Sequence, residues 1–138
     1  MDDKAANRHW AQTVTQSIGL RGMRVDARLF LNDHEVPARR VDDIILTLSE
    51  LASNALSASV GPEALVVVEL DLASSSIIKV TVTNSPSTQL TAMELRDSRM
   101  PGPECVHGRG LPLVTLLAAR LAITNGNKSI TVVAEFTI

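Results

Sequence analysis

The sequence contains few aromatic residues and a single cysteine. Phenylalanine, tryptophan and tyrosine together make up 2% of the chain, so its core must be aliphatic, and it lacks the stacking surfaces of single-strand nucleic-acid binders. Cys105 has no second cysteine in the chain with which to form a disulfide. This excludes a small secreted domain held together by disulfides and favours the reducing environment of the cytoplasm.

The chain also lacks an excess of basic residues and a long apolar run. Its 13 Lys and Arg residues stand against 15 Asp and Glu residues, a net charge of -2, so we expect no direct nucleic-acid partner. No stretch approaches the roughly eighteen uncharged apolar residues of a membrane-spanning helix, and residues 1–4 lack the features of a signal peptide. We therefore expect a cytoplasmic protein with no membrane partner.

The length of 138 residues suits one domain, and the 45% of hydrophobic residues can form its core. Apolar periodicity indicates helices at 24–32, 37–60 and 111–121 and strands at 65–72, 77–83 and 130–138. Residues 1–22 are poorly defined and fit either a strand or a short helix. Residues 84–107 form a long irregular segment, which is typical of a functional lid or a disordered insertion. Asn125 and Gly126 favour a tight turn, so the chain is expected to close with a hairpin.

A carboxylate and a carboxamide lie one turn apart on the central helix. At about 100° per residue, Glu50 and Asn54 project about 40° apart, on a face that also carries Thr47 and lies roughly opposite the apolar stripe. Such a pair can hold a hard cation or orient a hydroxyl group. The alternative is an ordinary solvated face, although such a face would favour Lys and Arg, and neither occurs in residues 42–75.

Glycines between the irregular segment and the next helix form a second candidate site. The run Gly108, Arg109, Gly110 and Leu111 lets the main chain approach a ligand closely, and free amides at a helix start suit a phosphate group. Glycine before a helix is also common in ordinary loops, and one glycine pair is weak support. Both interpretations stay open at this point.

Two polar residues on the predicted strands complete the set of candidates. Asn84 follows the second strand of the hairpin, and Thr131 lies on the last strand. Both side chains could reach a pocket at the edge of the sheet. The alternatives are a generic turn at Asn84 and a surface position for Thr131.

In this order, the candidate sites resemble the Bergerat-type ATP-binding fold shared by gyrase, histidine kinases and their relatives. The resemblance rests on E-L-x-x-N-A at residues 50–55, a strand that ends in an acid or amide, a long lid, and G-R-G-L-x-L-V at residues 108–114 before a terminal strand. Among the members, the chain is similar to the single-domain anti-sigma-factor serine kinases of bacteria, especially the short actinobacterial type.

The resemblance implies an α+β fold, a two-layer sandwich in which helices cover one face of a mixed, mostly antiparallel sheet and ATP lies between the helices and the lid. Asn54 would coordinate magnesium, and Glu50 would take the proton from the attacking hydroxyl. Residues 108–111 would lie against the phosphates. Asn84 would take the place of the family's adenine-binding aspartate, and Thr131 would face the nucleotide.

The function implied by the resemblance is that of a bacterial anti-sigma regulatory factor. Such a protein binds a sigma factor and an anti-anti-sigma factor, phosphorylates a serine of the latter, and commonly forms a homodimer. The first alternative is a binding module of the same fold that has lost its nucleotide, which is favoured by Asn84 and Ser129 where the family has aspartate and glycine. The second alternative is a phosphate-binding hydrolase without a protein substrate.

Overall fold

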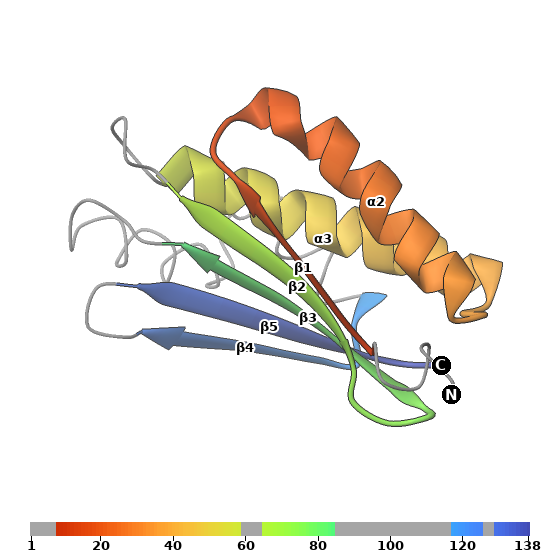
Figure 1. Ribbon diagram of the computed structural model, residues 1–138. Helices are drawn as coiled ribbons and strands as arrows, with labels where there is room; N and C mark the ends of the chain where they lie inside the picture. The colour runs from red at the N-terminus through yellow and green to blue at the C-terminus, as the bar shows by residue number, and fades with distance from the viewer. Residues whose placement is uncertain (1–7, 59–64, 85–116, 126–128) are drawn as a thin grey trace.

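In the described part of the chain, five strands form one open sheet, and two helices pack on one of its faces (Figure 1). The structure is a computed structural model that describes residues 8–58, 65–84, 117–125 and 129–138. In chain order its elements are β1 (His9–Val14), the 3-10 turn η1 (Ser17–Gly19), α2 (Leu20–Asp33), α3 (Ala38–Ala58), β2 (Val66–Leu72), β3 (Ile77–Asn84), β4 (Arg120–Asn125) and β5 (Ile130–Thr137). The α+β class that the resemblance implies is confirmed.

The sheet has the strand order β1-β2-β3-β5-β4, and every pairing in the described part of the chain is antiparallel. The sheet is therefore antiparallel throughout and not mixed. Along β2, β3 and β5, buried side chains alternate with half-exposed ones, which is the pattern of a sheet with one face against a core. Asn84 is the last residue of β3 and pairs with Val66 on one side and Ile130 on the other.

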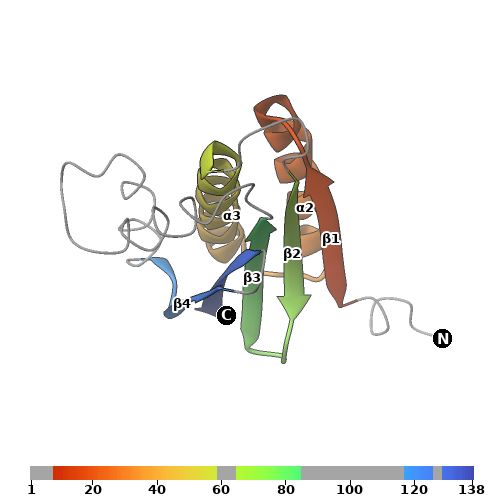
Figure 2. The same cartoon turned by 90° about the vertical axis from the view of Figure 1, so that its left-hand side faces the viewer.

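The two helices cover the part of the sheet formed by β1, β2 and β3. The helix α3 packs mainly on β3 and β2, whereas α2 packs on α3 and β1; Figure 2 shows both on the same side of the sheet. The stripe of apolar residues predicted in the sequence is the buried side of α3. Its buried apolar residues are Val41, Ile44, Ile45, Leu48, Leu51, Ala52, Ala55 and Ala58.

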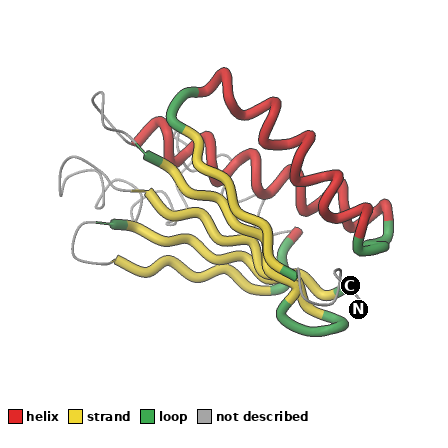
Figure 3. Tube along the Cα trace, in the orientation of Figure 1, coloured by secondary structure: helices red, strands yellow, loops and turns green. Residues whose placement is uncertain are grey.

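A short connection holds α2 and α3 side by side (Figure 3). At the end of α2, the amide of Val36 donates to the carbonyl of Leu31 at 3.1 Å, while Glu35 adopts a left-handed backbone with a φ of 59°. His34 donates from Nδ1 to the carbonyl oxygen of Phe30, and the rings of these two residues contact each other in a tilted arrangement, with centroids 4.5 Å apart. These contacts end α2 at a fixed place and reverse the chain into α3.

Most of the predicted elements are confirmed, and two boundaries need correction. The helices at 24–32 and 37–60 and the three predicted strands match elements of the structure. In the poorly defined segment 1–22, residues 9–14 form β1 and residue 20 begins α2. Of the helix predicted at 111–121, residues 111–116 lie outside the described residues, and its predicted end is wrong because Arg120 and Leu121 pair with Glu135 and Ala134 as part of β4.

Candidate functional site

Glu50 and Asn54 lie on the side of α3 that faces away from α2. The opposite side is identified by Ile45, which lines the groove between the two helices, and by Asp42, whose carboxylate bonds Arg28 of α2 at 2.9 Å. At about 100° per residue, Glu50 lies about 140° and Asn54 about 180° around the helix from Ile45. Both side chains therefore project toward the β5 side of the sheet, which α2 and α3 leave largely uncovered.

This side of α3 is not a solvated face. Glu50 and Asn54 are half-buried, and Thr47, on the same side, is completely buried. The Nδ2 atom of Asn54 and the Oγ1 atom of Thr47 are shielded from solvent and have no hydrogen-bond partner among the described residues. A buried polar group without a partner costs about 1–3 kcal/mol, so its presence calls for a specific explanation. The structure thus disfavours the solvated alternative for these residues.

Asn84 lies against the last turn of the same helix. Its side chain is 1% exposed, and its Nδ2 atom donates to the main-chain carbonyl oxygen of Ala55 at 3.1 Å. Ala55 directly follows Asn54, so this contact joins the end of β3 to the part of α3 that carries the candidate site. The structure therefore brings Asn84 close to the turn of α3 that carries Asn54.

Thr131 does not belong to this group. It pairs with Thr83 in the sheet, and the two Oγ1 atoms lie 3.3 Å apart. Its neighbours Ile130 and Val132 belong to the buried core, so the alternation of the strand puts Thr131 on the other face of the sheet. The structure therefore does not bring the hydroxyl of Thr131 together with Asn54 and Asn84.

Further predictions concern the glycine motif, the lid and Ser129. The glycine motif Gly108, Arg109, Gly110 and Leu111 and the segment 85–107 lie outside the described residues. Ser129 is half-buried and directly precedes Ile130, the partner of Asn84 in the sheet. Within the described ranges, no group of three or more His, Cys, Asp or Glu side chains could hold a metal ion. No helix there has the length and apolar character needed to cross a membrane.

The sequence pattern assigns Thr47 to a polar face, whereas in the structure its side chain is completely buried. The signal was present in the sequence, because Thr47 has Ile44 three residues before it and Leu51 four residues after it. Both of these residues belong to the buried stripe. A residue between two such neighbours lies at the border of the buried surface.

The fold defines the class of the protein, and a comparison with known families supports the same class. The described part of the chain is an α+β fold, in which a five-stranded antiparallel sheet has helices on one face. Its candidate ligand site is the group of polar side chains where the end of α3 lies over β3. Residues 13–135 match the model of the histidine kinase-like ATPase domain, so the chain belongs to this family. The family binds ATP, typically with magnesium. A comparison with curated proteins finds no match.

Proposed function

We propose that the chain binds MgATP along the side of α3 that carries Thr47, Glu50 and Asn54. Membership of the histidine kinase-like ATPase family supports the binding of ATP. The location rests on one observation, the buried Nδ2 atom of Asn54, which has no hydrogen-bond partner in the described part of the protein. A ligand with acceptor oxygens would supply this partner.

The amide of Asn54 has the chemistry that a nucleotide with its cation requires. Its oxygen is a suitable ligand for magnesium, and its nitrogen can donate to a phosphate oxygen. When bound, MgATP supplies the phosphoryl group and a cation that neutralises part of its negative charge. The residue is held in place by the helix, since Ala52 and Ala55 on either side of it are buried in the core.

We assign proton transfer to Glu50. Its half-buried carboxylate lies one turn before Asn54, and no ion pair within the described residues engages it. As the hydroxyl oxygen of a partner's serine attacks the terminal phosphorus of ATP, Glu50 accepts the hydroxyl proton and ADP leaves. A carboxylate that makes no competing salt bridge is available for this task.

The resemblance to anti-sigma-factor serine kinases supports a regulatory role in the bacterial cytoplasm. In this proposal, the chain binds a sigma factor, and phosphorylation of a serine on an anti-anti-sigma factor decides whether the sigma factor is captured or released. A homodimer is part of the same proposal. The nearly neutral charge of the chain agrees with protein partners and not with direct binding to nucleic acid.

One observation favours a second candidate, a binding module that has lost its nucleotide. Asn84 stands where the family has the aspartate that binds adenine, and its amide donates to the Ala55 carbonyl. A side chain with this structural task, and without a negative charge, binds adenine less strongly than a carboxylate does. In this alternative, only the docking of partner proteins remains.

A thermal-shift titration with magnesium and ATP separates the two candidates. Nucleotide at a hundred times its dissociation constant raises the free energy of unfolding by about 2.7 kcal/mol. For a chain of this size, this corresponds to an increase in Tm of roughly 5–10 °C. The variant Asn54→Ala should lose this response, and Ser53→Ala, an exposed neighbour on the same helix, should keep it. A Tm that stays constant up to millimolar MgATP selects the binding module.

Transfer of labelled phosphate to the purified anti-anti-sigma partner tests the kinase step. The variant Glu50→Gln should keep the thermal response to MgATP and lose at least about a hundredfold in transfer rate, because it removes the proton acceptor and preserves the shape of the side chain. Transfer at the native rate by Glu50→Gln would remove Glu50 from this role. Absence of transfer by the native chain, together with normal MgATP binding, would remove the kinase activity and keep the nucleotide site.

A further inference from the structure

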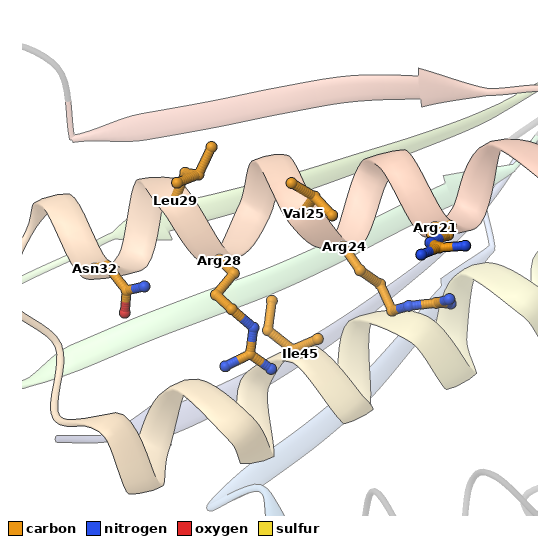
Figure 4. Close-up of a pocket in the computed structure, with 7 residues that line it drawn as sticks. All are labelled: Arg21, Arg24, Val25, Arg28, Leu29, Asn32 and Ile45. Carbon is orange, nitrogen blue, oxygen red and sulfur yellow. The ribbon is translucent and has the colours of Figure 1, made fainter.

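The helices α2 and α3 enclose a groove on the side of the protein opposite the candidate nucleotide site. Its volume is about 380 Å³, and it is lined by Arg21, Arg24 and Arg28 of α2 and by Ile45 of α3. In Figure 4, the side chains of Arg24 and Arg28 extend from α2 toward α3, and Ile45 points toward them from the other helix. The guanidinium groups of the arginines thus lie beside the apolar side chain of Ile45.

The positive charge of this groove is mostly uncompensated. Arg21 and Arg24 make no ion pair with any described residue. Arg28 bonds Asp42 at 2.9 Å, but both side chains stay accessible, at 45% and 71% exposure, so solvent weakens this pair. The protein as a whole has a net charge of -2, and the groove therefore differs in sign from the rest of the molecule.

Two aliphatic side chains lie beside the arginines on the outer side of α2. Val25 is 53% exposed and Leu29 is 62% exposed, and both line the groove. A pair of exposed aliphatic residues next to arginines is costly to leave in water and is typical of a protein contact, where arginine and apolar groups carry much of the binding energy.

We propose that this groove binds an acidic amphipathic helix of a partner protein. Carboxylates of that helix would pair with Arg21 and Arg24, and its aliphatic side chains would cover Val25, Leu29 and Ile45. The inference deepens the proposed function, on which it rests for the existence of a protein partner. It assigns a docking surface that is separate from the nucleotide site, because Ile45 and Asn54 lie on opposite sides of α3.

Charge and polarity identify the occupant. Nucleic acid would use the arginines but leave Val25 and Leu29 without a partner. A second copy of this chain, joined through the same groove by a two-fold axis, would bring the arginines of the two copies together and create repulsion between like charges. A helix that carries carboxylates and an aliphatic side can pair with the arginines and also cover the exposed aliphatic side chains.

Fluorescence anisotropy with a labelled synthetic peptide tests the proposal. The probe is an amphipathic helix in which Leu recurs at the three-and-four spacing and Glu flanks it, and the control is a peptide of the same composition in scrambled order. The native chain without nucleotide should bind the probe with a dissociation constant on the order of 10–100 µM. Binding should weaken as salt rises from about 0.05 M to 0.5 M, because screening reduces the contribution of the arginines.

Variants of the groove then locate the contact. Arg24→Glu should weaken binding about tenfold by reversing a charge that faces the probe, and Leu29→Ser should weaken it about fivefold by removing apolar contact. Arg39→Glu is the matched control, since Arg39 is an exposed arginine of α3 outside the groove and should change binding less than about twofold. The Tm of each variant shows that it is folded, which is expected because the three native side chains lie at the surface.

Four results would overturn the proposal: no saturable binding of the probe, equal binding of the scrambled peptide, equal binding by Arg24→Glu, or displacement of the probe by inorganic phosphate alone. Self-association of the native chain that Arg24→Glu abolishes would assign the groove to a second copy instead. The test is independent of the nucleotide site, because Asn54→Ala should bind the probe as the native chain does. Failure to bind MgATP and failure to bind the probe are thus separate outcomes.

Discussion

The side-chain amide of Asn84 donates to the main-chain carbonyl oxygen of Ala55 at 3.1 Å and so connects the end of β3 to the last turn of α3. Carbonyl groups in the last turn of a helix form the negative end of its dipole, which favours a nearby N–H donor. A buried N–H donor is therefore well matched to this position. The contact lies next to Asn54, so it also positions the candidate nucleotide site.

The first prediction is that Asn84→Asp destabilises the protein. The substitution exchanges a donor for a carboxylate that faces a carbonyl oxygen and the negative end of α3, so the free energy of unfolding should fall by about 1–3 kcal/mol at pH 7. Burial raises the pKa of the introduced carboxyl above its unfolded value of about 3.9. Stability should be closest to native below that unfolded pKa and be lost as the pH rises through the folded pKa.

Chemical denaturation of the native chain and the variant between pH 4 and pH 8, a range of about four units in which the carboxyl titrates, measures this effect. The control is Gln16→Glu, an exchange of amide for carboxylate at an exposed position before η1, which should change stability by less than about 0.5 kcal/mol. Equal stability of Asn84→Asp and the native chain at pH 8 would show that the bond to Ala55 contributes nothing.

The second prediction is that Asn54→Ala does not destabilise the protein in the absence of nucleotide. The native Nδ2 atom is buried without a partner among the described residues, so its removal relieves a cost, and alanine also favours the helix by about 0.5 kcal/mol. The free energy of unfolding should rise by about 1 kcal/mol. Loss of the response to MgATP together with a gain in stability is the expected signature of a residue kept for binding.

Ser53→Ala separates the two contributions to this result. Ser53 is exposed on the same turn of α3, so its replacement changes helix propensity by a similar amount without removing a buried polar group. Asn54→Ala should exceed it by about 0.5 kcal/mol or more in urea denaturation. A variant less stable than the native chain by 1 kcal/mol or more, about a fivefold change in the folding equilibrium, would mean that the amide has a partner in the free protein.

Much of the fold could be predicted because its periodic patterns are strong. The strands 66–72 and 77–84 are almost continuously apolar or alternate cleanly, and α3 carries an apolar stripe over its whole length. The strand 9–14 escaped prediction because it is an edge strand in which Val14 alone is fully buried, so its sequence shows little alternation. The start of β4 was missed because the apolar residues there continue the helical pattern before it.

The candidate site could be predicted in part, for a different reason. Glu50 and Asn54 belong to one helix, so their spacing fixes their relative direction without knowledge of the fold. The partner of Asn84 is a main-chain carbonyl 29 residues earlier in the chain, and no side chain in the sequence marks it. The position of Thr131 was open to prediction, because the alternation of Ile130 and Val132 already assigns it to the other face of the sheet.

The third prediction is that Thr131→Val leaves the binding of MgATP unchanged. The hydroxyl of Thr131 lies 3.3 Å from that of Thr83 on the face of the sheet away from α3, so it cannot serve a ligand at Asn54. Loss of the cross-strand pair should lower the free energy of unfolding by about 0.2–1 kcal/mol, and Thr83→Val should have the same small effect. If the thermal response to MgATP disappears in Thr131→Val but persists in Thr83→Val, then Thr131 contributes to the binding of MgATP and the prediction is wrong.

The fourth prediction is that Thr47→Val stabilises the protein. Thr47 is completely buried on α3, and its Oγ1 atom has no hydrogen-bond partner among the residues that the structure describes. Valine has nearly the same shape and similar helix propensity, so the exchange removes the unsatisfied hydroxyl without leaving a cavity. The free energy of unfolding should rise by about 1 kcal/mol.

The matched control for this exchange is Thr137→Val at an exposed position of β5, which should stay within about 0.5 kcal/mol of the native chain in urea denaturation. A loss of stability in Thr47→Val would mean that the hydroxyl is bonded in the free protein. If the exchange stabilises the free protein and also reduces the thermal response to MgATP, then Thr47 contributes to the same ligand site as Asn54, because both side chains project from one side of α3 and lie about 20° apart around it. A stabilised variant with a full response to MgATP would instead limit the site to Glu50, Asn54 and the end of β3.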